Sequence, residues 1–180
     1  MLNKKNIIML IITIIIVITC SCIIYFGWSK KEPLKMVFLG EVENEIVYDN
    51  MTIKELSDKL NRSLNSTVSG KGYLIASHSL EMGVDPYVAT AILLHETGCK
   101  WECSYLVKTC NNVGGMVGYG CGSYSFFPSL DEGIIAFIDN LSYNYVSYGL
   151  VTPEQINSKY ASDTSWAYKV NNYIEIIKAQ

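Results

Sequence analysis

A glutamate at the end of an apolar helical run is the clearest candidate for chemistry in this sequence. Glu96 follows the apolar stretch Ala91–Leu94 and His95, and Gly98 comes two residues later. An apolar surrounding and the negative end of the helix dipole both disfavour an ionised carboxylate, so they favour the neutral acid. A neutral carboxylic acid is suited to general acid catalysis. The alternative is a glutamate that faces solvent at a helix end.

A loop rich in asparagine, glycine and tyrosine follows this helix and has the residue types that bind sugars. Amide groups can donate to and accept from hydroxyl and acetamido groups, glycines allow close backbone approach, and aromatic rings offer flat faces. The candidate sugar-binding residues are Asn111, Asn112, Gly114, Gly115, Tyr119 and Tyr124. The alternative is an ordinary turn flanked by aromatic residues with a packing role.

Four cysteines lie in the same stretch, at Cys99, Cys103, Cys110 and Cys121. An even number of clustered cysteines in an exported domain favours two disulfides, and three pairings are open. A four-thiolate zinc site is the alternative, but the paired C-x2-C spacing typical of such sites is missing. No H-E-x-x-H motif is present either, so we expect neither a metal nor a cofactor.

The elements that must position these residues are helical. Thr52 with Glu55 and Ser129 with Glu132 form capping boxes, and Asp85–Pro86 is typical of a helix start. These signals and the apolar spacing predict helices beginning near residues 52, 73, 86, 129 and 153, and a last one capped by residue 162 or 163. The helix from 86 is apolar nearly all round, which predicts burial. We therefore expect a mainly α domain over residues 51–180.

A long uncharged segment precedes this domain. Residues 7–28 contain no charge and, at about 1.5 Å per residue, form a helix of roughly 33 Å, enough to cross a bilayer core. We interpret 1–6 as a cytoplasmic head, 7–28 as a transmembrane signal anchor and 29–50 as a connector. A cleaved signal peptide or a lipid-modified Cys20 or Cys22 are the alternatives. All three interpretations place the domain outside the cytoplasm, on the cell-wall side of the cell membrane.

The charge of the chain argues against nucleic acid as a partner. The formal net charge is −3 and the isoelectric point about 5.4, whereas phosphate binding leaves a basic footprint. No phosphate-binding loop or dinucleotide fingerprint is present.

Three stretches of this sequence resemble one family. They are GKGYLIASHSLEMGVDPYVATAILLHETG at 70–98, NNVGGM at 111–116 and KYASDTSWAYKV at 159–170. In this order and spacing they resemble bacterial endo-β-N-acetylglucosaminidases of the lysozyme-like superfamily, which cleave peptidoglycan glycan strands. The resemblance spans about residues 52–178. It implies a lysozyme-like helical fold, Glu96 as catalytic acid, Tyr160 in the same cleft, and the Asn111–Gly115 turn along the sugar groove.

Two features depart from that family or leave its chemistry open. The cysteine-containing stretch 99–103 replaces the small residues that often follow the glutamate. A second carboxylate is not evident, since Asp163 fits a helix cap and Glu102 lies between two cysteines, so a substrate-assisted mechanism is the simplest. We expect His95 to pack behind the site, because side chains of neighbouring helical residues diverge by about 100°.

Several functions therefore stay open. The first expectation is a membrane-anchored peptidoglycan hydrolase, an N-acetylglucosaminidase. A lytic transglycosylase or a muramidase of the same fold is the nearest alternative. A non-catalytic wall-binding module, or a structural subunit of an envelope assembly with protein partners, is the alternative from another class.

Overall fold

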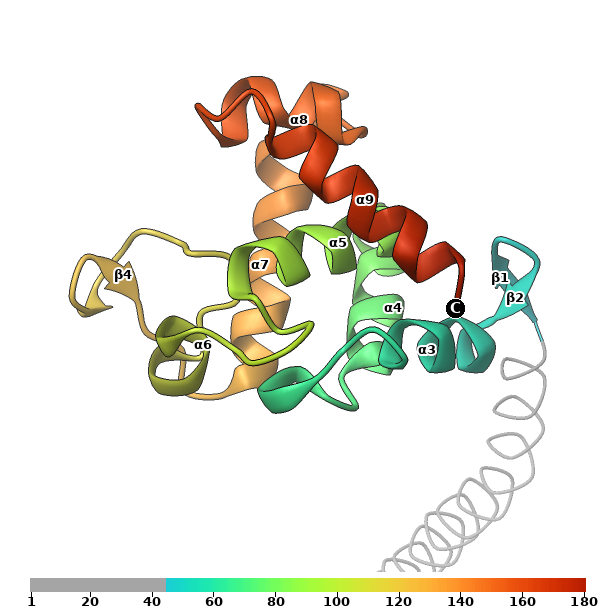
Figure 1. Cartoon of the computed structure of the whole chain (residues 1–180), viewed down its shortest axis with the longest axis horizontal. Coiled ribbons are helices and arrows are strands. Elements are labelled where there is room, and N and C mark those ends of the chain that lie inside the picture. Colours follow the sequence, from blue (N-terminus) through green and yellow to red (C-terminus); the bar gives the residue numbers. More distant parts are fainter. Residues whose placement is uncertain (1–44) are drawn as a thin grey trace, which may run out of the picture. The chain divides into compact units, whose positions relative to one another are not determined.

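The computed structural model describes residues 45–180, which are mainly helical (Figure 1). The predicted head, the predicted transmembrane segment and nearly all of the predicted connector lie outside the described residues. Among residues 45–180, none of the helices has the length and apolar character that crossing a membrane requires. Residues 46–180 form one compact unit.

The described part begins with a small hairpin that leads into a capped helix. Strand β1 (Ile46–Tyr48) pairs antiparallel with β2 (Met51–Thr52), and α3 (Ile53–Asn61) follows at once. The predicted capping box is confirmed: Thr52 Oγ1 accepts from the Glu55 amide at 3.3 Å, and a Glu55 oxygen accepts from the Thr52 amide at 2.8 Å. Local sequence alone therefore positions the start of this helix.

The two helices expected to begin near residues 73 and 86 are present. A short 3-10 turn, η1 (Ser66–Val68), precedes α4 (Gly72–Glu81), and α5 (Pro86–Thr97) follows. Asp85 accepts hydrogen bonds from the amides of Tyr87 and Val88 at 2.8 and 3.2 Å, which caps α5. Gly98 ends the helix at a φ of +68°, a left-handed conformation that glycine adopts readily.

The predicted burial of α5 is confirmed. Ten of its residues are buried, including the whole run from Pro86 to Leu94. Helix α5 packs against α4 and against the C-terminal helix α9 (Trp166–Lys178), which crosses it in Figure 1. Glu96 is thus held at the end of the most deeply buried helix of the described part.

The stretch between α5 and residue 129 is irregular, as predicted. It contains one short helix, α6 (Tyr105–Cys110), and a hairpin of β3 (Gly120–Cys121) and β4 (Tyr124–Ser125). Helix α7 (Leu130–Asn144) then begins after Ser129, whose hydroxyl accepts from the Glu132 amide at 3.2 Å. It ends at Asn144, and Val146–Tyr148 forms the 3-10 turn η2.

The last two helices meet at the segment that joins them. Helix α8 (Pro153–Tyr160) starts at a second complete capping box, formed by Thr152 and Gln155. Helix α9 starts at Trp166, two residues later than a cap at Asp163 implies. The reason is a local turn in which an Asp163 oxygen accepts from both the amide and the hydroxyl of Ser165, at 2.8 and 2.7 Å. Ser165 therefore takes the cap position.

Candidate active site

Glu96 lies in the last turn of α5 and faces the first residue of α9. The indole nitrogen of Trp166 donates a hydrogen bond to Glu96 Oε1 at 3.0 Å. Trp166 is 3% exposed, while Glu96 is only partly buried. The packing of α5 against α9 thus brings together two residues that are 70 positions apart in the sequence.

Tyr160 joins this pair from the end of α8. Its ring stacks on that of Trp166, with centroids 4.8 Å apart and planes 29° apart. Its hydroxyl donates to the carbonyl oxygen of Gly114 at 3.5 Å, which ties α8 to the loop after α6. Burial, and next the nearby charge of Glu96, raise the pKa of Tyr160 above the ordinary range, so the phenol is neutral at physiological pH. The structure therefore brings Glu96, Trp166 and Tyr160 into one cluster.

The partners of Glu96 leave one of its oxygens available for proton transfer. The ion pairs among residues 45–180 include no lysine or arginine bound to Glu96. An indole N–H only donates, so the oxygen that it contacts acts as an acceptor. When the carboxyl is neutral, Oε1 is then the carbonyl oxygen and the proton lies on Oε2. Trp166 in this way orients the group without neutralising it.

The two loop asparagines hold the loop together. Asn112 is 1% exposed. Its Nδ2 donates hydrogen bonds to the carbonyl oxygens of Met116 and Ser125, at 2.9 and 3.0 Å. Its Oδ1 accepts a hydrogen bond from the Met116 amide at 2.9 Å. Asn111 adopts a φ of +54°, and its Nδ2 donates to the Phe127 carbonyl at 2.8 Å. Both side chains are thus engaged with loop backbone, and direct contact with a sugar stays a prediction for them.

The two loop glycines differ in what they contact. A Cβ at Gly114 would meet Cδ2 of the buried Phe137 at 2.5 Å, so the backbone there needs the space that glycine leaves. Gly115 instead has a φ of +60° and open space around it. Close packing at Gly114 fixes the carbonyl that accepts from Tyr160.

The two tyrosines predicted to bind sugar rings lie in β4 and directly before β3. Tyr124 is 39% exposed and lines a cavity of about 680 Å³ together with Tyr105 and Phe126. Tyr119 is 94% exposed, and it is not part of the lining of that cavity. Phe126 could be expected in this lining, because it lies two residues after Tyr124 in the sequence. Tyr105 could not, because it lies on α6, outside that aromatic stretch.

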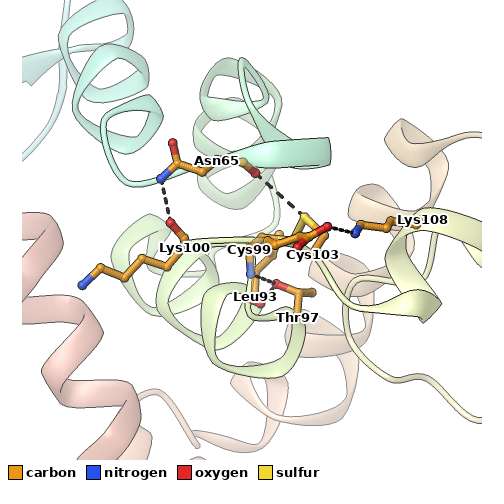
Figure 2. Close-up of a disulfide and its surroundings, with 8 residues drawn as sticks. Asn65, Leu93, Thr97, Cys99, Lys100, Cys103 and Lys108 are labelled. Atoms are coloured by element: carbon orange, nitrogen blue, oxygen red, sulfur yellow. Dashed lines mark hydrogen bonds and ion pairs between the residues drawn. A yellow bond between two sulfur atoms is a disulfide. The ribbon is translucent and has the colours of Figure 1, made fainter.

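The four cysteines form two pairs at disulfide distance, which confirms the expected bridges. Cys99 pairs with Cys103, with Cα atoms 4.2 Å apart, and Cys110 pairs with Cys121, with Cα atoms 6.0 Å apart. Figure 2 shows the first pair just after the end of α5, where Asn65 donates to the Lys100 carbonyl at 2.8 Å. The first pair closes the loop behind Glu96, and the second ties the hairpin to α6.

The other acidic residues considered as partners of Glu96 are occupied elsewhere. Asp163 pairs with Lys169 at 2.7 Å, and hydrogen bonds from Lys169 and then from Ser165 lower the pKa of Asp163 below its ordinary range. Glu102 is exposed and pairs with Lys108, which lowers the pKa of Glu102. His95 packs its ring near those of Trp166 and Tyr173, with centroids 6.2 and 6.3 Å away.

Trp166 is the site residue that sequence reasoning missed, although it lies within the stretch 159–170. Within the part of the chain that the structure describes, no cluster of three or more His, Cys, Asp or Glu side chains could hold a metal ion.

Comparison with known proteins adds no family: no protein-family model matches the chain, and a search of the curated proteins finds no significant match.

Proposed function

We propose that residues 51–180 form a lysozyme-like domain that cleaves β-1,4 glycosidic bonds in the glycan strands of peptidoglycan. The proposal takes Glu96 as the general acid and N-acetylglucosaminidase as the activity. The observation that supports it most is the cluster of Glu96, Trp166 and Tyr160, which joins two distant parts of the sequence around one carboxyl group. These parts belong to two of the three stretches that resemble the glucosaminidases, 70–98 and 159–170.

The proposed reaction begins with proton transfer from Glu96. Its Oε2 gives a proton to the glycosidic oxygen, and the bond from that oxygen to the anomeric carbon breaks. No second carboxylate in the cluster is placed to attack the anomeric carbon. We therefore assign the attack to the acetamido oxygen of the substrate, which forms a cyclic oxazolinium ion. Water then attacks the same carbon, and the Glu96 carboxylate takes up the proton that the water loses.

Tyr160 has a positioning role in this scheme. Its phenol stays neutral, so it adds no charge beside the forming cation, and its oxygen, whose proton is donated to Gly114, can accept a hydrogen bond from the acetamido N–H. The stacking on Trp166 and the contact with Gly114 restrict the ring to one orientation. A hydroxyl oxygen restricted in this way loses less entropy when it orients a substrate group.

The cellular setting in this proposal follows from the sequence outside the described residues. Residues 7–28 would anchor the chain in the cell membrane and place the domain on the wall side. The two cysteine pairs support an oxidising compartment, since disulfides persist mainly outside the cytoplasm. The anchor would confine cleavage to glycan close to the membrane.

Mass spectrometry of the products from purified peptidoglycan tests the activity and its bond specificity together. A reducing N-acetylglucosamine end is the expected product. A reducing muramic acid end would instead identify a muramidase, and an anhydro end a lytic transglycosylase. Binding to the glycan without any release of fragments would show a wall-binding module, and the proposal would then be wrong.

A further inference from the structure

A cavity with cationic and aromatic walls lies along α9, beside the Glu96 cluster. Its volume is about 330 Å³. The residues that matter for its chemistry are His95, Lys100, Trp101, Lys169, Asn172 and Tyr173. None of them has a role in the proposed proton transfer, and sequence reasoning had assigned none of them to ligand binding.

The position of the cavity relates it to the site. Lys169 and Tyr173 lie one and two turns after Trp166 on α9, so the cavity begins about 5 Å along the helix from the residue that binds Glu96. His95, the neighbour of Glu96 on α5, packs near the rings of both Trp166 and Tyr173. A substrate held at Glu96 would therefore have a substituent within reach of this cavity.

The charges around the cavity sum to a surplus of one cation. Lys169 is neutralised by its ion pair with Asp163 at 2.7 Å. Lys100 has no carboxylate partner among the ion pairs of the described residues; its ammonium instead lies 5.4 Å from the ring of Trp101 and 6.0 Å from that of Tyr173. The side-chain amide of Asn172, also in the wall, can donate and accept hydrogen bonds. A cation between two aromatic faces, with no anion of its own, is suited to an anionic ligand.

Lys100 and Trp101 are held in place by a closed loop. The Cys99–Cys103 pair spans this loop, and Asn65 donates to the carbonyl oxygens of both Cys99 and Lys100, at 3.0 and 2.8 Å. The Trp101 amide donates to the Gly98 carbonyl at 3.0 Å. Figure 2 shows the Lys100 side chain leaving the loop toward α9. The cysteine-containing insertion that departs from the family pattern therefore builds one wall of the cavity.

We propose that this cavity binds a carboxylate carried by a substituent of the substrate, with Lys100 as the main contact. The inference rests on the proposed function, since peptidoglycan is the ligand that would bring a carboxylate to this position. Two sources share that chemistry: the peptide stem, and the lactyl group of a muramic acid without its peptide. Neutral glycans such as chitin fragments carry neither.

Binding measurements without turnover test this proposal. The full-length chain carrying Glu96→Gln is titrated by calorimetry with three probes: a disaccharide–peptide with free carboxylates, its fully amidated counterpart, and the peptide-free disaccharide with its lactyl carboxylate. We expect the free carboxylate probe to bind about two- to fivefold more tightly than the amidated one, the range of a partly exposed ion pair. Lys100→Gln should remove the difference, and Lys100→Arg should keep it.

The control is Lys54→Gln on α3, which changes the net charge equally at a site outside the cavity. Equal affinity for the free and amidated probes, or the same loss in Lys54→Gln as in Lys100→Gln, would overturn the inference. Tight binding of the lactyl probe identifies that group as the source, and binding of the peptide probe alone identifies the stem. If the carboxylate preference is present but the unaltered chain releases no glycan fragments, the proposed hydrolysis fails while the binding site stands.

Discussion

Removal of the Cys110–Cys121 bridge should lower stability by an amount that follows from the length of the loop it closes. The perturbation is the double substitution Cys110→Ala and Cys121→Ala, which avoids a new buried hydroxyl, because Cys110 is fully buried. Cys110 ends α6 and Cys121 lies in β3, so the bridge joins the aromatic hairpin to the helix before the site loop.

The magnitude comes from the entropy of the unfolded chain. The two cysteines are 11 positions apart, which closes a loop of 12 residues when both are counted. The chain-entropy relation then gives about 2.8 kcal/mol at 25 °C. The Cys99–Cys103 bridge closes only five residues, from a separation of four, and gives about 2 kcal/mol. For the 135 residues of the unit 46–180, a loss of about 2.8 kcal/mol lowers the melting temperature by about 10 °C.

The assay is guanidinium unfolding of the unaltered chain and of the two double variants, with and without reductant. Cys99→Ala with Cys103→Ala is the matched control, because it removes the same number of thiols from a shorter loop. Each variant should match the loss predicted for its own bridge, and reductant should affect the unaltered chain most. A loss below about 1 kcal/mol in the free energy of unfolding of the 110–121 variant would show that this bridge does not stabilise the protein by restricting the unfolded chain.

Three further predictions concern the site cluster. Gly114→Ala should lower the free energy of unfolding by about 1–3 kcal/mol in urea titrations, because its Cβ would meet Phe137, and an unchanged midpoint would contradict this packing. Trp166→Phe should reduce glycan release about tenfold, because phenylalanine keeps a ring against Tyr160 but cannot donate a hydrogen bond to Glu96. The control is Tyr168→Phe, at an exposed position on the same helix, which should leave the rate of glycan release unchanged. Above pH 10 the unfolded chain releases the Tyr160 proton that the folded chain retains, so stability should fall by up to about 1.4 kcal/mol per pH unit, and Tyr160→Phe should make this decline shallower.

The helix starts were predictable because their signals are local. Thr52, Asp85 and Thr152 each bond to amides two or three residues away, so the sequence contains both partners of the cap. The start of α9 expected from a cap at Asp163 was wrong by two residues, because Asp163 has its own local partner in Ser165. Two local hydrogen-bonding patterns competed there, and the sequence pattern does not rank them.

The site itself was predictable only in part, because its contacts are long-range. Glu96 could be singled out as a carboxyl group in an apolar context, whereas its bond to Trp166 depends on how α5 packs against α9. The side chain of Asn112 was predicted to face a ligand, yet the fold directs it into hydrogen bonds with Met116 and Ser125. The choice among three cysteine pairings likewise needed three-dimensional positions.

The role of Glu96 as a proton donor is tested most directly by the rate at which new reducing ends appear in purified peptidoglycan. Glu96→Gln keeps an acceptor for the Trp166 indole but has no proton to transfer, so the rate should fall by at least about 100-fold. Glu102→Gln, an exposed glutamate six residues further on, should retain the rate of the unaltered chain. A Glu96→Gln chain that cleaves glycan as fast as the unaltered one would contradict the account.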